Sequence, residues 1–521
     1  MRKIVMLFAL LGGFTFISGC QPTPEESAVV SKLEGLDKES IAEPLKNDET
    51  VTIDIPQPWK VSEKRSADRV RIEADLRMDE IKVGNLPVME MKNHEMSAEE
   101  LEKLVEYFAG DEKLYQPETD TRKDYQKEIE CIKNREGAYA DPVLYSVYQS
   151  RVEGLEEALE LAPEKESFTE INKIDFTEKT EDKAWEKVQA ATLTEEELES
   201  MLKKRKQDIY FEADAGQERT SHIQAENYRD TLANSSYFKW WTGDISLNEE
   251  TIQRWITTAN VNAEGIGNTY YLQRKERLED YEKLVKQESF QTQEGLEKAE
   301  IVLKELGIRQ MKLSHTQKAL WFPDGTFSNY NIELLDSQIL SSDLENAETG
   351  YEFTFTRGFG GLSAGQLQGS VVGDTASGVN AYAPPFPVEK ISVVVTKSGV
   401  RSFIWEGICE EAGTVAENTK LLAFEDIEKR LLDYIYYSYT MLAQPADNKT
   451  KFTYTIYDLS LGYTYVPAFK NPQNAWLVPA WFVKAKEYID AKAEGGKAYE
   501  RGTVEVMVNA LDGGLIAYPD S

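Results

Sequence analysis

Two hairpin-like segments in the second half of the chain constrain its fold most. Residues 391–405 read Ile-Ser-Val-Val-Val-Thr-Lys-Ser-Gly-Val-Arg-Ser-Phe-Ile-Trp, and residues 504–518 read Val-Glu-Val-Met-Val-Asn-Ala-Leu-Asp-Gly-Gly-Leu-Ile-Ala-Tyr. Both segments are rich in residues that favour strands, and a Ser-Gly or Asp-Gly step interrupts each one. Each segment is therefore predicted to form two antiparallel strands joined by a tight turn.

The same order of elements precedes both hairpins. Apolar residues at helical spacing predict a helix at 293–306 and another at 424–439. Strands are predicted at 309–313, 318–322 and 351–357 after the first helix, and at 451–465 and 476–484 after the second. One helix can hardly cover one sheet face alone, so we expect two repeated helix-plus-meander units that share a core.

The first half mixes strands and helices without a motif that specifies a chemistry. Residues 51–55 and 70–76 alternate between apolar and polar, which is typical of half-buried strands. Ser97-Ala-Glu-Glu100 is a capping box, and a helix is expected to follow it up to Gly110. The predicted fold class is α+β, with antiparallel sheets and packed helices.

The chain of 521 residues is too long for one core. The expected division is a signal peptide at 1–19, a tether at 20–49, an N-terminal α+β domain at 50–290, and two repeated units at 291–410 and 411–521.

The first twenty residues have the pattern of a secretory signal. Arg2 and Lys3 precede an apolar run at 4–17, and small residues follow at Ser18 and Gly19. The run is shorter than the roughly 20 apolar residues of a membrane span. Export from the cytoplasm is therefore expected.

Ile17-Ser-Gly-Cys20 resembles the lipobox of bacterial lipoproteins. The resemblance implies that Cys20 is lipidated and becomes the mature N-terminus, at the extracytoplasmic face of the cell membrane. Residues 20–49 are then expected to be a flexible tether with a reach of about 30 Å. The lipid would be the only membrane attachment, since no second apolar run approaches membrane-spanning length.

The net charge argues against nucleic acid as a partner, and the cysteine content argues against a disulfide. The formal net charge is −32, and loss of Arg2 and Lys3 with the signal would make it −34. Such a surface repels phosphate backbones, so nucleic acid is not expected as a partner. Besides Cys20 only Cys131 and Cys409 are present. Two free buried thiols are favoured over one long-range disulfide.

The closing strands resemble PepSY-like units. The resemblance rests on two segments, Trp476-Leu-Val-Pro-Ala-Trp-Phe-Val483 and Val506-Met-Val-Asn-Ala-Leu-Asp-Gly-Gly-Leu-Ile516. The layout is similar to that of the YycH and YycI type regulators of a Gram-positive sensor kinase, which are held by a transmembrane helix that this sequence lacks. The whole chain also resembles an uncharacterised family of envelope lipoproteins from Gram-positive anaerobes.

One catalytic motif is matched in part. Gly361-Leu-Ser-Ala-Gly365 has the Gly-x-Ser-x-Gly pattern of a nucleophile elbow, which requires a following helix and a later histidine. The next residues do not predict a helix, and His94, His222 and His315 all precede the serine. A glycine-rich loop is the preferred interpretation, while a triad in another order stays open.

Metal and cofactor sites are not predicted. The three histidines and two remaining cysteines are scattered singly, and no phosphate-binding glycine loop occurs. The chain has 91 acidic residues, so no single pair of carboxylates stands out as a glycosidase dyad. No catalytic, cofactor-binding or metal-ligating residue is therefore nominated.

Aromatic clusters and one long loop remain as candidate binding features. The aromatic residues are Tyr434, Tyr436, Tyr437, Tyr439, Trp476, Trp481, Phe482 and the segment 238–241. They could stack on sugars, but core packing is the preferred interpretation. The loop 358–387 is rich in Gly and Ser, and a loop of this length is either functional or disordered.

Three hypotheses of function follow. The preferred one is a non-enzymatic envelope lipoprotein that acts as a binding or regulatory module on another extracytoplasmic protein. The second is an enzyme that acts on cell-wall material. The third is a ligand-capture protein with a pocket between its two halves.

Overall fold

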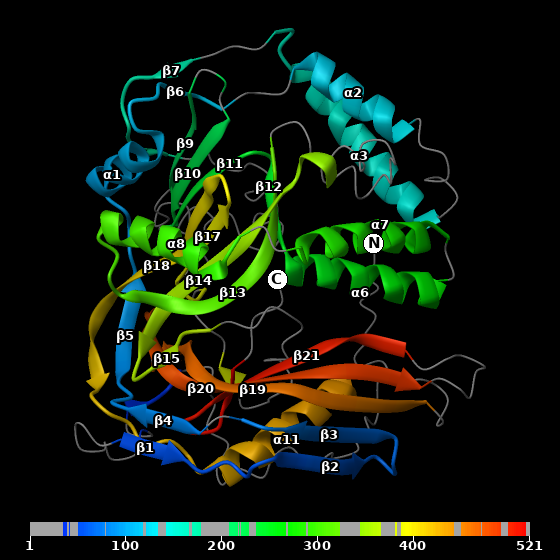
Figure 1. Cartoon of the computed structure of the whole chain (residues 1–521), viewed down its shortest axis with the longest axis vertical. Helices are drawn as coiled ribbons and strands as arrows, with labels where there is room; N and C mark the ends of the chain where they lie inside the picture. Colours follow the sequence, from blue (N-terminus) through cyan, green and yellow to red (C-terminus); the bar gives the residue numbers. More distant parts are fainter. Residues whose placement is uncertain are drawn as a thin grey trace, which may run out of the picture.

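The computed structural model places two β-sheets one above the other, with helices packed around them (Figure 1). It describes residues 35–38, 41, 50–78, 80–117, 121–133, 142–165, 169–178, 208–216, 218, 220–228, 236–266, 269–287, 290–323, 344–365, 381–382, 387–441, 450–469, 471–490 and 499–516.

The upper sheet is antiparallel throughout. Its order is β7-β6-β9-β10-β11-β18-β17-β14-β13-β12, and β8 also pairs with β9. The strands are β6 (Leu114–Tyr115), β7 (Glu170–Ile171), β8 (Thr177–Glu178), β9 (Ile209–Ala215), β10 (Ser221–Asn227), β11 (Ser236–Thr242), β12 (Ile245–Asn248), β13 (Met311–Phe322), β14 (Glu348–Phe359), β17 (Lys390–Thr396) and β18 (Gly399–Ala416). The short strand β15 (Leu362–Ser363) forms a hairpin with the end of β14.

The lower sheet is mixed. It contains β2 (Trp59–Arg65), β3 (Val70–Leu76), β5 (Val88–Asn93), β16 (Ala381–Tyr382), β19 (Lys451–Ala468), β20 (Asn471–Asp490), β21 (Tyr499–Asn509) and β22 (Leu515–Ile516). The pairs β3–β19 and β16–β22 are parallel. A separate ribbon consists of β1 (Thr50–Ile53) and β4 (Ile81–Gly84).

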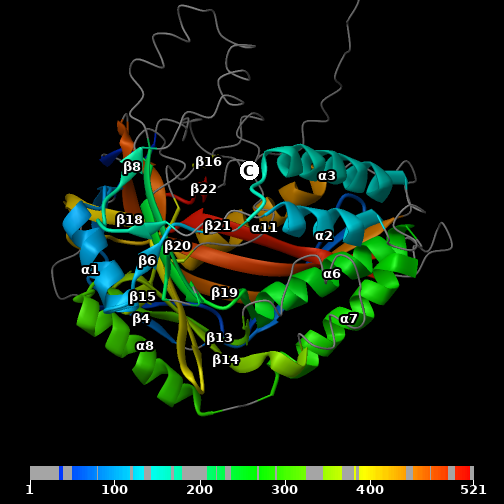
Figure 2. The same cartoon turned by 90° about the horizontal axis from the view of Figure 1, so that it is seen from above.

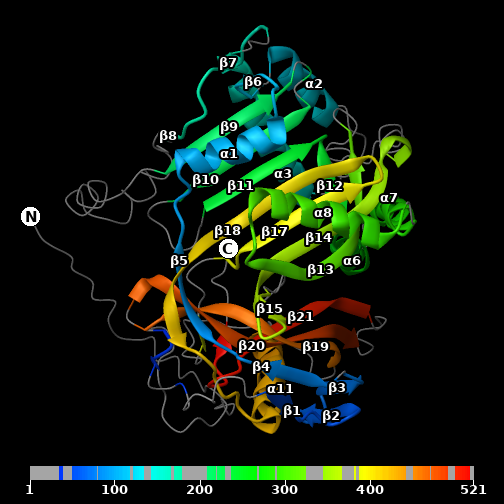
Figure 3. The ribbon, with the colours of Figure 1, turned by 60° about the vertical axis from the view of Figure 1, so that its left-hand side comes forward.

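Strand β18 joins the two sheets. Its first part pairs with β11 and β17 in the upper sheet, and its last part pairs with β5 of the lower sheet. Figure 3 shows β5 and β18 running from one sheet to the other. The boundaries expected at 290/291 and 410/411 therefore do not separate the sheets, because β18 crosses the second and the lower sheet combines β2, β3 and β5 with β19–β21.

Seven helices lie in the described ranges. They are α1 (Ala98–Ala109), α2 (Arg122–Lys133), α3 (Pro142–Leu161), α6 (Glu249–Ile266), α7 (Thr269–Val285), α8 (Thr292–Leu306) and α11 (Phe424–Met441). In Figure 2, α2, α3, α6 and α7 lie on the opposite side of the molecule from α1. None of the described helices has the length and apolarity needed to cross a membrane.

Two large hydrophobic cores lie between the sheets and the helices that cover them. Helices α1 and α8 cover the upper sheet around Phe353, Phe238 and Phe403. Helix α11 covers the lower sheet around Trp59 and Trp481, on the side away from the upper sheet. The predicted α+β class with antiparallel sheets and packed helices is confirmed, and the lower sheet adds two parallel pairs.

Helix α1 shows why the local predictions succeed. The Ser97 hydroxyl accepts a hydrogen bond from the Glu100 amide at 3.2 Å, and the Glu100 carboxylate accepts one from the Ser97 amide at 2.7 Å. The helix ends at Gly110, as predicted. The capping box provides hydrogen-bond acceptors for backbone N–H groups at the start of the helix and uses residues three positions apart. It can therefore be recognised from the sequence alone.

Part of the expected tether is docked on the body. Leu36 is fully buried, and its amide donates a 2.9 Å hydrogen bond to the Pro467 carbonyl at the end of β19. Gly35 precedes it with a φ of 90°, and a Cβ there would lie 2.5 Å from the Pro467 oxygen. The expectation of free chain throughout 20–49 is thus corrected at Leu36, because one leucine finds an apolar site on the lower sheet.

Candidate functional site

A cleft of about 1110 Å³ lies between the two sheets. Its lining comes from β13, β14, β15 and β17 above, from β19 and β20 below, and from the start of α6. The cleft is partly open to solvent and mixes polar with apolar side chains. It is the candidate functional site.

The upper wall is built by the alternation of β14. Phe353 and Phe355 point into the core beneath α8 and are almost completely buried. Glu352, Thr354 and Thr356 alternate with them and line the cleft. Strand geometry places successive side chains on opposite faces, so one aromatic and one polar face result from the same six residues.

Neighbouring strands extend the polar face in register. Ser392 of β17 lies opposite Thr354, and Lys390 lies opposite Thr356. On the other side of β14, His315 of β13 lies opposite Thr354. Directly opposed residues share a face of the sheet, so these side chains form one continuous wall.

The lower wall follows the same logic. Asp458 of β19 is opposite Lys484 of β20, and Ser460 is opposite Phe482. All four line the cleft, whereas Trp481 points to the other face and packs under α11. Each sheet therefore has an apolar side against helices and a cleft side that carries polar groups.

The start of α6 closes one end of the cleft. The Asn248 side-chain amide donates to the Glu352 carboxylate at 2.6 Å, and the Asn248 side-chain oxygen accepts from the Thr251 amide at 2.8 Å. Asn248 therefore caps the helix and fixes Glu352 at once. The Gln317 amide lies 3.5 Å from the same carboxylate.

The lysines in the cleft are already paired. Lys484 lies 4.0 Å from Glu250 and 3.8 Å from Glu505, and Lys390 lies 3.3 Å from Glu406. These pairs neutralise most of the positive charge that the wall presents. The cleft therefore offers little unbalanced charge to select a strongly charged ligand.

Glu406 gives the stability of this wall a predictable pH dependence. Burial alone would raise the pKa of Glu406, but Lys390 and Lys239 lower it below its usual value. A depressed carboxylate pKa stabilises the fold above the unfolded value and loses that contribution as pH falls through the folded value. Wild type should be more stable than Glu406→Gln at pH 7, and urea titrations should show this difference shrinking below about pH 4.5. A difference that stays constant down to about pH 3 would contradict this account.

Thr356 carries an unpartnered hydroxyl on the upper wall. The residue is only 4% exposed, and its Oγ1 has no hydrogen-bond partner among the described residues. A buried hydroxyl without a partner costs free energy, so its presence in a cleft wall points to a ligand or solvent partner.

A buried polar network lies directly beside the cleft. The Arg357 guanidinium donates to Glu389, to Glu411 at 3.0 Å and to the Cys409 carbonyl at 2.8 Å. Trp405 donates to Glu389 at 3.1 Å. The network joins β14, the residue before β17, and β18 where β18 passes from the upper to the lower sheet.

Burial and pairing oppose each other in this network. Burial raises the pKa of Glu389, and the Arg357 guanidinium offsets only part of that rise. Burial alone would lower the pKa of Arg357, but the Glu389 carboxylate keeps it above its usual value. Burial also raises the pKa of the Cys409 thiol, which lies 3.2 Å from the Tyr465 hydroxyl. Cys409 is a free thiol, and this thiol is inert rather than reactive.

The Gly-x-Ser-x-Gly segment lines the cleft but does not form an elbow. Ser363 lies in β15, a two-residue strand, rather than between a strand and a helix. Ser363 pairs with Gly358, whereas His315 pairs with Thr354, four residues away along β14. That offset is about 13 Å along the strand, too far for a hydrogen bond. Ser363 and His315 therefore both line the cleft but lie too far apart to act together.

The other two histidines lie elsewhere. His94 contacts Glu410 at 3.0 Å and Glu100 at 3.1 Å, and His222 contacts Asp214 at 2.8 Å. Neither residue lines the cleft. Among the residues that the structure describes, no group of three or more His, Cys, Asp or Glu side chains is placed to hold a metal ion.

Most of the aromatic residues pack in the cores, as preferred. Tyr434, Tyr439, Trp476 and Trp481 are buried, and so are Phe238 and Trp240. Phe482 is buried too, but it also contributes to the cleft wall. Of the loop 358–387, Gly361 to Gly365 line the cleft, while most of the rest lies outside the described residues. Cys20 and the side chain of Cys131 also lie outside them.

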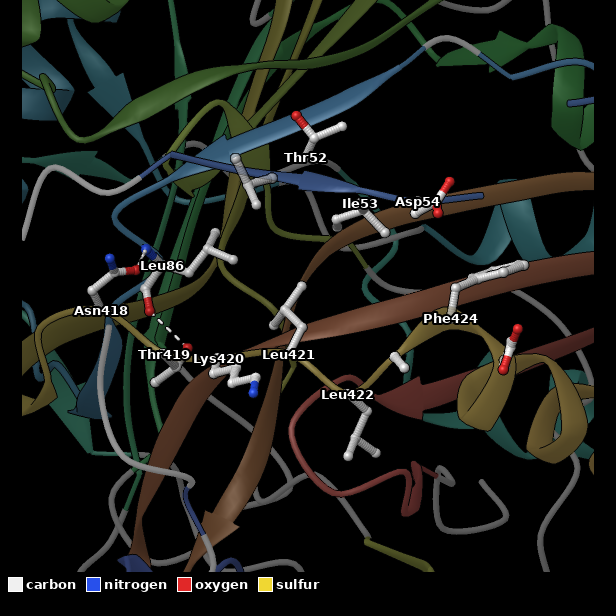
Figure 4. Close-up of a pocket in the computed structure, with 13 residues that line it drawn as sticks. Thr52, Ile53, Asp54, Leu86, Asn418, Thr419, Lys420, Leu421, Leu422 and Phe424 are labelled. Carbon is white, nitrogen blue, oxygen red and sulfur yellow. Dashed lines mark hydrogen bonds between the residues drawn. The ribbon is translucent and has the colours of Figure 1, made fainter. Parts of the chain in front are cut away.

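A second, smaller pocket lies at the base of the lower sheet (Figure 4). It has a volume of about 450 Å³ between the β1–β4 ribbon and the segment before α11. The Asn418 side chain accepts from the Leu86 amide at 2.9 Å, and Thr419 donates to the Leu86 carbonyl. Ile53, Leu421 and Phe424 give it mostly apolar walls.

The sequence interpretation missed the cleft residues, although their signal is present. Residues 351–356 read Tyr-Glu-Phe-Thr-Phe-Thr, a strict alternation of aromatic and polar positions. Such a pattern predicts a strand with one polar face but does not say whether that face meets solvent or a second sheet.

No family model matches the chain. No curated protein matches it either. Among solved structures, it is similar to a crystal structure of an uncharacterized protein from Eubacterium rectale ATCC 33656, with 10% sequence identity, a TM-score of 0.40, and coverage of 89% of this chain and 94% of that one. A likeness at this level carries no argument about the fold or the function.

Proposed function

We propose that the protein is a non-enzymatic binding protein, held at the outer face of the cell membrane by lipid on Cys20, which takes its ligand in the cleft between the two sheets. The observation that carries the proposal is the cleft of about 1110 Å³ with the unpartnered Thr356 hydroxyl in its wall. Ligand pockets usually measure about 300–1,000 Å³ and contain a few polar groups in fixed positions.

The fixed polar groups support this proposal. Asn248 and Glu352 restrain each other, and Lys390 and Lys484 are restrained by carboxylates. Side chains held in this way lose little conformational freedom when a ligand arrives, which favours binding.

A regulatory role on an envelope protein is the second candidate. Helix α8 precedes β13, β14, β17 and β18, and helix α11 precedes β19, β20 and β21. This shared order supports the proposal of two repeated, PepSY-like units. The two roles are compatible, since an occupied cleft could alter what the body presents to a partner.

A thermal-shift screen of sugars and peptides tests the binding role. Any ligand that binds only the folded state raises the melting temperature by mass action. The full chain should respond to at least one compound, and Ser392→Trp should abolish the response by filling the cleft. Ser62→Trp, on the exposed face of β2 outside the cleft, is the matched control and should respond like wild type. A thermal shift that persists in Ser392→Trp would mean that the ligand binds outside the cleft, and it would refute the proposal.

A further inference from the structure

The chemistry of the cleft walls is dominated by hydroxyls. Seven of the lining side chains are Ser or Thr, and they come from β13, β14, β15, β17 and β19, so both sheets contribute. A hydroxyl donates one hydrogen bond, accepts two and rotates to suit its partner. Walls of this kind match a ligand that itself carries many groups able both to donate and to accept.

The charges of the lining do not favour an ionic ligand. Three basic residues, Arg254, Lys390 and Lys484, face four acidic ones, Glu249, Glu250, Glu352 and Asp458. Both lysines have carboxylate partners, and Glu352 has an amide partner. The whole chain has a formal charge of −32, which opposes the approach of a polyanion. The cleft therefore suits a neutral ligand.

The size of the cleft and its apolar patches narrow the class of ligand further. The volume of about 1110 Å³ exceeds that of most small-molecule pockets, so the cleft fits several linked units better than one. Phe482, Leu461 and Leu362 supply apolar surface among the hydroxyls. Alternating hydroxyl edges and C–H faces are the chemistry of linked sugar rings.

Strands β14, β17 and β20, at the centre of the walls, are poorly suited to a peptide added as an extra strand, whereas the Met311–Lys318 part of β13 pairs with β14 on one side only. That mode of recognition requires an unpaired strand edge. Strand β14 is paired with β13 and β17, β17 with β14 and β18, and β20 with β19 and β21. The cleft presents the faces of these strands, so side chains rather than backbone groups meet the ligand.

We propose that the cleft binds a neutral oligosaccharide, held by hydroxyls from both sheets, with Thr356, Ser392 and Thr354 on the upper wall and Ser460 on the lower. The inference rests on the proposed function and specifies its ligand. In the proposed complex the Thr356 side chain rotates, so that its buried Oγ1 gains its missing partner from a sugar hydroxyl.

The test is calorimetric titration of the full chain, in a detergent without a sugar headgroup, against four defined probes. Cellotetraose and chitotetraose are neutral, tetragalacturonic acid is anionic, and tetra-alanine is a peptide. At least one neutral tetrasaccharide should bind. Thr356→Val and Ser392→Ala should each weaken that binding about fivefold to tenfold, because each removes one hydrogen bond to the ligand.

Two controls keep the result interpretable. Ser62→Ala removes an exposed hydroxyl outside the cleft and should leave affinity unchanged. Thr356→Val deletes a buried hydroxyl that has no partner, so the melting temperature should stay equal or rise, which a structural role would not produce.

The outcomes separate the two proposals. Binding of the acid or the peptide but of neither neutral sugar, with loss in Ser392→Ala, refutes the oligosaccharide inference and leaves the binding cleft standing. If a neutral tetrasaccharide binds to both wall variants as tightly as to wild type, the ligand does not lie at Thr356 and Ser392, and the proposed site is wrong. If none of the four probes binds and the thermal-shift screen is also silent, both proposals are wrong.

Discussion

Replacing Arg357 with Met is expected to lower the free energy of unfolding by about 3–5 kcal/mol, because it leaves a buried carboxylate without its counter-ion. Glu389 is fully buried, and among the described residues its further side-chain donors are Trp405 and the Cys409 thiol. Urea denaturation monitored by tryptophan fluorescence measures the effect.

A double variant distinguishes the charge from the packing. Arg357→Met combined with Glu389→Gln removes both charges, so it should be clearly more stable than Arg357→Met alone. Lys60→Met is the comparison at an exposed ion pair, where Lys60 and Asp75 lie 3.2 Å apart with side chains 63% and 67% exposed. It should change stability by less than about 1 kcal/mol. Equal losses in the single and double Arg357 variants would show that the network acts through shape rather than charge.

Replacing Phe353 with Ala is expected to cost about 3–5 kcal/mol, since it opens a cavity in the core beneath α8. Phe353 is fully buried and neighbours Tyr351, which it approaches at 6.1 Å between ring centroids. Chemical denaturation with an unchanged slope would identify a pure loss of stability.

The adjacent residue provides the matched control. Thr354 belongs to the same strand but faces the cleft, so Thr354→Ala should change stability far less than Phe353→Ala. Similar losses at both positions would mean that both faces of β14 are packed, and the cleft would not exist in solution.

The elements that were predictable from the sequence are those fixed by neighbours in the chain. The capping box at Ser97 and the alternation of 70–76 each rest on residues a few positions apart, and α1 and β3 follow them closely. The helix predicted at 424–439 corresponds to α11, which begins at Phe424.

The pairing of distant strands was not predictable in this way. Strand β3 pairs in parallel with β19, with Val70 opposite Phe452, although nearly three-quarters of the chain separates them. Alternation identifies which face of a strand is apolar but does not identify its partner. The expected domain boundaries at 290 and 410 rested on order along the chain, so they could not anticipate this contact.

The buried network and the cleft were missed for a related reason. Glu389 stands between Val388 and Lys390 in a segment that reads like an ordinary strand start, and nothing local indicates that Arg357 will meet it. Thr354 and Ser392 likewise look like solvent-facing positions until the second sheet lies opposite them. Convergence of this kind is a property of the tertiary fold.

The docking of Leu36 limits where the body can sit relative to the bilayer. Gly35 lies fifteen positions after Cys20, with fourteen residues between them, and even a fully extended chain of that length spans only about 50 Å. With the proposed lipid on Cys20, the end of β19 at Pro467, to which the Leu36 amide is bonded, lies within about 50 Å of the membrane surface. The distance between the body and the membrane is then set by the residues before Gly35 rather than by the whole segment 20–49.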